Sequence, residues 1–397
     1  MQLITNQLPK TIVYGIGSFQ QVGVEARKVG TKALLISDQI MKSLGNVDRA
    51  GELLEESSVY WHEYLGVETE PKDIYVDQAL TLLQQNGCDH IIALGGGSCI
   101  DTAKAVAVLA TNGGTISDYM NGGRIAEKHP LPLIAIPTTG GTGSEATDVT
   151  VVTNTANAVK MMIKQEAFIP QKAIVDPVLT VSSPPHITAA TGIDALTHAL
   201  EAYISKKAHP FTDMLALSAL ERIYHHIEIA YHDGENLQAR HELIYGSMLA
   251  GMAFSNASVC LVHGMSRPIG ALFDVPHGVS NAMLLPVVLE YTKESCRDRL
   301  AEIARVLMPE RREDSEMELS DALVESFISL CARLDIPTLR QWGIDEELYA
   351  SQLEKMAVDA LESGSPQNNP RVPAKAEIMH LYEELFSYEQ RPVSKGK

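Results

Sequence analysis

The first 180 residues alternate short apolar runs with helical segments, and this alternation constrains the fold of the 397-residue chain most strongly. Strands separated by helices of ordinary length are typical of an α/β domain with a largely parallel sheet. We expect strands at residues 11–14, 33–37, 59–64, 90–94, 133–137 and 173–175. We expect helices at residues 18–29, 48–57, 74–86 and 98–110.

From about residue 183 onward, long helical patterns replace the strand signals. The pair Pro184 and Pro185 stands at this change in pattern. It predicts two domains, at residues 1–183 and 184–397. Helices are expected in the second domain at residues 188–205, 210–231, 238–254, 297–306, 315–334 and 378–386, and the last six residues are expected to fray.

The formal net charge of −18 argues against a nucleic-acid or anionic-membrane partner, because such a partner requires a basic face. No run of 18 apolar residues occurs, and the N-terminus lacks the layout of a secretion signal. The five cysteines form no CxxC motif. Reduced thiols and a cytoplasmic location are therefore expected.

Two clusters in the second domain contain potential metal ligands. Asp194 and His198 are four residues apart on a predicted helix, so they share one face. His263 and His277 flank a short segment in which Pro268 and other breakers predict a helix end, a turn and a new helix. One carboxylate and three imidazoles suit zinc, iron or a similar divalent ion. Spacing alone leaves open the alternative that these are structural histidines.

The stretch GGGSCIDTAK directly follows the strand predicted at residues 90–94 and opens a helix. Gly95, Gly96 and Gly97 allow a ligand to approach the backbone closely, and Ser98 can cap the helix. The N-terminus of that helix, with Asp101 in its first turns, offers free N–H groups to a pyrophosphate. The alternative is an ordinary tight turn between strand and helix.

Two further loops follow predicted strands. Asp38 ends the run ALLIS and can accept hydrogen bonds from a ribose diol, which favours NAD over NADP. It can equally serve as a helix N-cap. Thr138 and Thr139 begin the loop after LPLIAI, at the carboxyl edge of the sheet where ligands bind in open α/β folds.

Together these motifs resemble the iron-containing (group III) alcohol dehydrogenase family. The matching stretches run in family order over nearly the whole chain. They are GGGSxxDxAK at residues 95–104, PTTxGTGSE at 137–145, DPxLT at 176–180, TGxDALTHAxEAY at 191–203, VHGM at 262–265, PHG at 276–278 and NPR at 369–371.

The resemblance implies an α/β N-terminal dinucleotide-binding domain followed by an all-α C-terminal metal-binding domain, as in the dehydroquinate synthase-like and iron-type alcohol dehydrogenase architecture. It also implies NAD-linked hydride transfer between a small primary alcohol, diol or hydroxy acid and its aldehyde or ketone, with the metal polarising the oxygen. The implied metal is Fe²⁺, or Zn²⁺ in some members. The implied metal ligands are Asp194, His198, His263 and His277. The implied cofactor contacts are Asp38, Gly95, Gly96, Gly97, Ser98, Asp101, Thr138, Thr139 and Lys160. A homodimer or higher homo-oligomer is expected as well.

Two positions depart from the family pattern. Arg267 stands where many members have a histidine, which suggests either contact with an anionic substrate group or a structural ion pair. Glu70 stands before Pro71, where members often have asparagine. The alternatives to an alcohol dehydrogenase are a glycerol dehydrogenase-like enzyme, a dehydroquinate synthase-like enzyme, or a non-catalytic module that binds NAD and metal.

Overall fold

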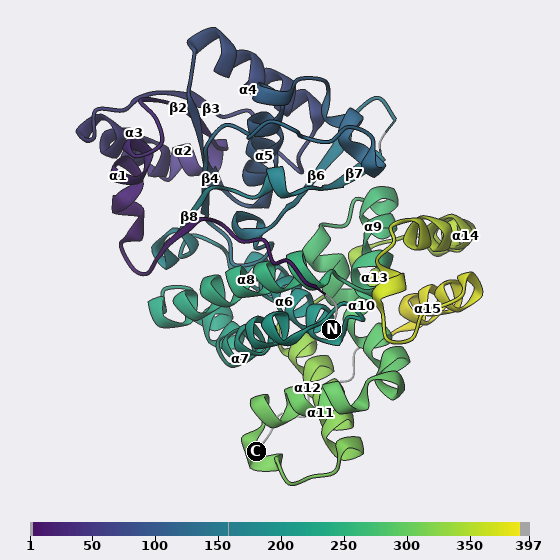
Figure 1. Cartoon of the computed structure of the whole chain (residues 1–397). Coiled ribbons are helices and arrows are strands. Elements are labelled where there is room, and N and C mark those ends of the chain that lie inside the picture. The colour runs from purple at the N-terminus through teal and green to yellow at the C-terminus, as the bar shows by residue number, and fades with distance from the viewer. Residues whose placement is uncertain (1–2, 158, 390–397) are drawn as a thin grey trace. The chain divides into compact units, whose positions relative to one another are not determined.

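The structure is a computed structural model that describes residues 3–157 and 159–389 (Figure 1). The expected fraying of residues 392–397 lies outside these ranges. The chain divides into two compact units, Met1–Val181 and Ser182–Lys397. The first is an α/β unit and the second is helical, which confirms the predicted fold class.

All six predicted strands form one parallel sheet, with the order β1-β8-β5-β4-β2-β3. Their bounds differ from the predicted ones by at most one residue. The strands are β1 (Thr11–Tyr14), β2 (Lys32–Ile36), β3 (Tyr60–Tyr64), β4 (His90–Gly95), β5 (Leu133–Pro137) and β8 (Lys172–Val175).

Both faces of this sheet are buried. Successive side chains of each strand point to opposite faces, so each strand contributes to two cores. In β4, Ile91 and Ala93 pack with α4 and α5, whereas Ile92 and Leu94 pack on the other face with α1 and α3 (Figure 1). The helices of this unit are α1 (Val22–Arg27), α2 (Gln39–Ser43), α3 (Asn46–Glu56), α4 (Asp73–Asn86) and α5 (Gly97–Asn112).

One hairpin of the first unit was not predicted. Strands β6 (Val149–Asn154) and β7 (Val159–Lys164) pair antiparallel and form a separate two-stranded sheet. Their buried residues alternate with more exposed ones, and β6 packs against α5. The sequence VTVVTN contains three hydroxyl or amide side chains, so its apolar alternation is weak.

The second unit consists of helices, as predicted, although α13 and α14 were not expected. All six helices expected at stated ranges have bounds within three residues of those predicted. The helices are α6 (Pro185–Ile204), α7 (Pro210–His232), α8 (Leu237–Ala257), α9 (Leu261–Phe273), α10 (His277–Thr292), α11 (Arg297–Leu307), α12 (Glu316–Arg333), α13 (Leu339–Trp342), α14 (Glu346–Glu362) and α15 (Lys375–Ser387).

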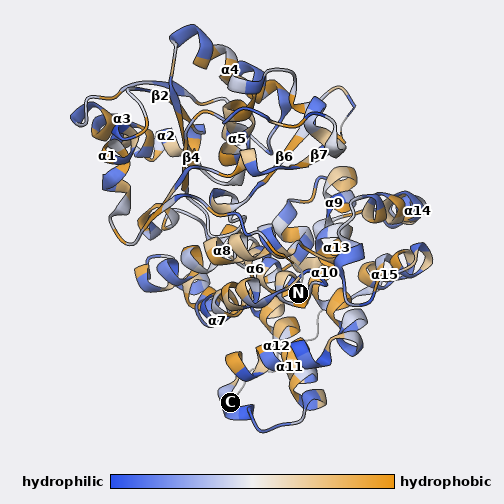
Figure 2. Ribbon diagram, viewed as in Figure 1, coloured by the Kyte–Doolittle hydropathy of each residue, from blue (hydrophilic) through white to orange (hydrophobic). Residues whose placement is uncertain are grey.

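Helix α6 lies at the centre of this unit. It is buried on all sides from Thr188 to its end, except at Thr191, and packs against α7, α8 and α10. A helix that is hydrophobic all round belongs in a protein core, and Figure 2 shows the largely apolar character of α6. Polar side chains on such a helix therefore require a specific partner.

Among the described residues, no single helix is long and apolar enough to cross a membrane. Helices α8 and α9 pass the same test only as a pair, by length and composition alone, and the pair is bent by 103°.

Candidate metal centre and nucleotide loops

Helix α6 carries the first two candidate ligands one turn apart. Asp194 and His198 are only 2% and 5% exposed. The ring of His198 stacks on Phe254 of α8 and on His263 of α9, with centroid distances of 4.2 and 4.3 Å. Packing of α6 against α8 and α9 thus fixes the position of the His198 ring.

The other two imidazoles come from α9 and α10. The predicted helix end, turn and new helix start between His263 and His277 are confirmed, with α9 continuing through Pro268 and ending at Phe273. Asp274 then adopts a left-handed conformation with φ 54°, and Pro276 precedes His277 at the start of α10. The turn thus lies at residues 274–276, within the predicted segment.

A glycine lets α10 approach α6. A Cβ at Gly278 would lie 2.7 Å from the carbonyl oxygen of Ala190 on α6. A side chain at this position would push the two helices apart, so the close approach requires the glycine of the PHG motif. This close approach carries His277 to Asp194.

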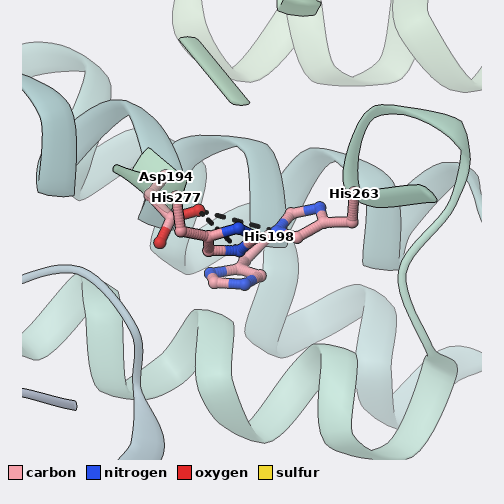
Figure 3. A group of neighbouring side chains, drawn as sticks. All are labelled: Asp194, His198, His263 and His277. Atoms are coloured by element: carbon pink, nitrogen blue, oxygen red, sulfur yellow. Dashed lines mark ion pairs between the residues drawn. The ribbon is translucent and has the colours of Figure 1, made fainter. Parts of the chain in front are cut away.

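The structure brings all four residues together (Figure 3). One potential ligand atom from each lies within 4.8 Å of those of the others. The Oδ1 atom of Asp194 is 3.5 Å from Nε2 of His263 and 3.9 Å from Nε2 of His277. The side chain of His277 is 39% exposed, whereas that of His263 is 3% exposed. The cluster is thus open on the His277 side.

The electrostatics of the cluster favour a cation. Burial alone would raise the pKa of Asp194, but the three imidazoles, led by that of His198, hold it well below its usual range. Burial alone would lower the pKa of His263, yet Asp194 and Glu201 raise it to about 9. One carboxylate oxygen and three imidazole nitrogens are ligands that suit a first-row divalent ion such as Fe²⁺ or Zn²⁺. The residues present therefore fit such a metal.

Three supporting residues were not predicted. Glu201 accepts a 2.7 Å hydrogen bond from Nδ1 of His263, and Nδ2 of Asn281 donates to Asp194 Oδ1 at 2.6 Å. The Oγ atom of Ser266 lies 3.3 Å from Nδ1 of His277. The only signal in the sequence is helical spacing. Glu201 is three residues after one ligand on α6, and Asn281 is four residues after another on α10.

Arg267 lies one helical turn after His263 and is partly exposed. Burial lowers the pKa of its guanidinium to about 10, with the charge of Glu201 acting in the opposite direction. Arg267 therefore keeps its positive charge at neutral pH next to the metal cluster.

In the first unit, three loops meet at the carboxyl edge of the sheet. The hydroxyl of Ser37 donates to the carbonyl of Leu94 at 2.6 Å, and the N–H of Thr138 donates to the carbonyl of Gly95 at 3.1 Å. These bonds join the ends of β2, β4 and β5. The predicted neighbouring loops are thus adjacent in the structure.

The glycine loop packs tightly against its neighbours. A Cβ at Gly95 would lie 2.6 Å from Cys99 Sγ, and one at Gly97 would lie 2.8 Å from a methyl group of Thr142. A Cβ at Gly96 would meet only Thr139, at 3.5 Å. Gly95 and Gly97 are thus required by packing, whereas Gly96 leaves a bare backbone at the helix N-terminus.

Ser98 does not cap the helix, contrary to the prediction. Helix α5 begins at Gly97, Gly96 is its N-cap residue, and no side chain caps it. The first N–H groups of an α-helix have no partner within the helix, so those of Gly97 and Ser98 suit a phosphate group.

Asp38 is a helix N-cap, one of its two predicted roles. Its Oδ1 accepts a 2.8 Å hydrogen bond from the N–H of Met41 at the start of α2. Its Oδ2 lies 3.6 Å from Cys99 Sγ. The carboxylate therefore lies beside the glycine loop, with Oδ2 directed toward it.

Asp101 and Lys160 lie apart from the glycine loop. Asp101, whose side chain is 13% exposed, accepts a hydrogen bond from the hydroxyl of Ser144 and a 2.8 Å bond from the N–H of Val151. It thus braces the loop after β5 instead of facing outward. Lys160 of β7 forms an ion pair with Glu70, the second residue that departs from the family pattern.

Comparison with known proteins gives a consistent result. The family model for iron-containing alcohol dehydrogenase matches residues 9–177, and the C-terminal model of the Fe-containing alcohol dehydrogenase family matches residues 188–386. Long-chain-alcohol dehydrogenase 1 of Geobacillus thermodenitrificans (strain NG80-2) is 40% identical over 378 residues, which cover 94% of each chain.

Two solved structures share the whole fold. A 1,3-propanediol oxidoreductase matches with a TM-score of 0.93 at 35% identity, covering 97% of this chain and all of the other. A sulfoacetaldehyde reductase from Bifidobacterium kashiwanohense, in complex with NAD⁺, matches with a TM-score of 0.87 at 28% identity, covering 98% of this chain and all of the other. The chain therefore belongs to the iron-containing alcohol dehydrogenase family and is an NAD(H)-linked, iron-dependent enzyme that interconverts alcohols and aldehydes.

Proposed function

We propose that this enzyme acts on a small primary alcohol, diol or hydroxy acid, with Fe²⁺ held by Asp194, His198, His263 and His277. The observation that carries the proposal is the convergence of the four ligand atoms within 4.8 Å in a largely buried cluster. When bound, such an ion polarises the alcohol or carbonyl oxygen. The residues themselves hold the ion and leave the His277 side open for a substrate.

We propose that the first domain, residues 1–183, binds NAD at the carboxyl edge of its sheet, while residues 184–397 form the catalytic metal domain. The pyrophosphate would contact the N–H groups at the start of α5. Asp38 would accept the ribose hydroxyls through Oδ2, since Oδ1 is occupied by the N-cap bond. The proposed contacts are Asp38, Gly95, Gly96, Gly97, Ser98, Thr138, Thr139 and Lys160, with Asp101 bracing the loop that follows β5.

Lys160 already has an anionic partner. Its Nζ pairs with Glu70, and since an ammonium group has three N–H donors, a cofactor oxygen would share Nζ with that carboxylate. We propose that Glu70 weakens the contribution of Lys160, because the carboxylate already compensates part of its charge.

Arg267 is proposed to contact the substrate. Its guanidinium is charged and the residue follows His263 by one turn of α9, so a carboxylate or sulfonate on a bound aldehyde or alcohol would be attracted to it. The similarity to a sulfoacetaldehyde reductase supports an anionic substrate, and that to a 1,3-propanediol oxidoreductase supports a diol.

The test is NADH formation, followed at 340 nm, with chelator-stripped protein and a panel of alcohols, diols and hydroxy acids. We expect no activity in the stripped protein and a return of activity when Fe²⁺ is added anaerobically. The activity with added Zn²⁺ is measured for comparison. Bound metal without net NADH formation from any member of the panel would contradict the proposed chemistry. It would favour a dehydroquinate synthase-like reaction or a non-catalytic module.

We also propose that the enzyme is a homodimer or higher homo-oligomer in the cytoplasm. Strand β1 is an edge strand, and Tyr14 at its end and Ile16 just after it are more than half exposed. All five cysteines are buried free thiols, as suits a reducing compartment. Light scattering of the purified protein should give at least twice the mass of one chain, 43.2 kDa.

A further inference from the structure

Glu201 is the most heavily engaged carboxylate near the metal cluster. It lies on α6, three residues after His198, and is 1% exposed. Its Oε1 accepts a 2.6 Å bond from the N–H of Val262. Its Oε2 accepts a 2.8 Å bond from the N–H of Cys260 and a 2.7 Å bond from Nδ1 of His263. One side chain thus accepts three hydrogen bonds, from three of the four residues 260–263.

These bonds anchor the start of α9. Cys260 is the N-cap residue of α9, and its own side chain makes no capping bond. Glu201 supplies the missing acceptor from another helix, bonding both the N-cap residue and the second residue of α9. The position of His263, the third residue, is fixed by this anchor.

The same carboxylate determines which nitrogen of His263 faces the cluster. An ionised carboxylate only accepts hydrogen bonds, so Nδ1 must carry a proton. The other nitrogen, Nε2, points to Asp194 Oδ1 at 3.5 Å and is the atom available to a cation. A carboxylate behind a ligand histidine both orients the ring and makes its free nitrogen more basic.

We propose that Glu201 is a positioning residue of the metal centre, which holds His263 in the tautomer and orientation that a divalent ion requires. This inference rests on the proposed metal site. Loss of such a partner typically weakens metal binding about 10- to 100-fold. His277 has a hydroxyl group, Ser266 Oγ, in the corresponding position instead of a carboxylate.

The substitution Glu201→Gln tests this role because it keeps size and shape. An amide has one acceptor and one donor end. If its oxygen bonds Val262, its NH₂ group faces Nδ1 of His263 and forces the proton onto Nε2, which blocks the cation. If its oxygen bonds His263, the NH₂ group opposes the N–H of Val262. Neither orientation provides an acceptor both for the N–H of Val262 and for Nδ1–H of His263.

The measurement is the Kd for Zn²⁺ and for anaerobic Fe²⁺, obtained by competition with a chromophoric chelator. The matched control is Glu242→Gln on α8, a carboxylate that bonds Arg222 and Gln238. We expect Glu201→Gln to raise Kd at least 10-fold and Glu242→Gln to leave it within about 2-fold of the wild type. Equal Kd values for Glu201→Gln and the control would overturn the inference.

Two further outcomes are separable. If the wild-type protein binds no metal, the proposed metal site itself is wrong. If Glu201→Gln does not fold, ¹⁵N-histidine NMR of the Zn²⁺-loaded wild type decides the question. The signals of the His263 ring are assigned by their absence from the spectrum of His263→Gln. A protonated Nδ1 and a metal-bound Nε2 are expected, and the reverse pattern would overturn the role of Glu201.

Discussion

The side chains of Asn281 and Asp194 are joined by a 2.6 Å hydrogen bond from Nδ2 to Oδ1, and neither is exposed by more than 2%. The same Oδ1 atom faces Nε2 of His263 and of His277. Asn281 therefore stabilises the carboxylate oxygen that the cluster offers to a cation. Its amide is not among the usual ligands of a first-row divalent ion, so its role is to support Asp194.

Replacing Asn281 with leucine should destabilise the metal-free protein. The buried carboxylate of Asp194 would lose its donor while the volume of the side chain is nearly conserved. We expect the free energy of unfolding to fall by about 1–3 kcal/mol in urea titrations of stripped protein. The loss should be smaller with Zn²⁺ bound, because the ion neutralises the carboxylate. An equal loss with and without metal would contradict this account.

Removal of His263 and removal of His277 should have different effects on stability but similar effects on metal binding. Each variant loses one ligand, so His263→Ala and His277→Ala should both lose most bound metal, as measured by elemental analysis. Only His263→Ala removes a hydrogen bond to a buried carboxylate, that of Glu201, whose Oε2 keeps the N–H of Cys260 as its remaining donor; loss of a hydrogen bond to a charged group costs about 1.5–3 kcal/mol. His277→Ala should keep its melting temperature when metal-free, since its side chain is 39% exposed.

The exposed His380, whose side chain is 68% exposed, provides the matched control. His380→Ala should change neither metal content nor melting temperature. Metal retention by His277→Ala at the wild-type level would remove His277 from the ligand set.

The parallel sheet could be predicted because its strands are buried on both faces and read as continuous apolar runs. The hairpin of β6 and β7 could not, since only alternate residues are buried and the polar ones resemble a loop. A helix end and a turn between His263 and His277 could be predicted from the helix breakers there, but the exact end of α9 could not, because Pro268 usually breaks a helix. Here helix packing overrides that preference, and the helix ends at the left-handed Asp274.

In the metal cluster, the residues that could be predicted are those whose spacing and residue type indicate a metal ligand. Asp194 and His198 share a helical face, and a carboxylate with three imidazoles has a recognisable chemistry. Glu201 could not be singled out, since a glutamate on a helix is ordinarily a surface residue. Its role depends on the contact between α6 and α9, which no local pattern encodes.

Replacing Arg267 should change substrate preference more than general activity. If the guanidinium contacts an anionic group, Arg267→Ala should raise KM about 10-fold or more for carboxylated or sulfonated substrates, as for loss of a charge-assisted hydrogen bond of roughly 1.5–3 kcal/mol. KM for plain alcohols and diols should change little. Steady-state kinetics with matched pairs of substrates measure this, and an equal rise for both classes would assign Arg267 a structural role.

Glu145 gives the first unit a pH-dependent stability. It lies in the loop after β5 and is 1% exposed, and its Oε1 has no hydrogen-bond partner in the part of the chain that the structure describes. Burial raises the pKa of its carboxyl to about 7 from an ordinary 4.5, against the opposing effects of a backbone hydrogen bond and the charge of Lys104. A carboxyl whose pKa is raised on folding favours the folded state at low pH. That contribution is fully present below about pH 4.5 and is lost as the pH rises through 7.

The difference in stability between Glu145→Gln and the wild type should therefore depend on pH. Glutamine cannot ionise, so the variant should gain about 2–3 kcal/mol relative to the wild type between pH 4.5 and pH 8. Urea unfolding of metal-free protein across this range measures the difference. The exposed Glu127→Gln in the same unit is the control and should follow the wild type at every pH. A constant difference between Glu145→Gln and the wild type would show that Glu145 does not take up a proton on folding.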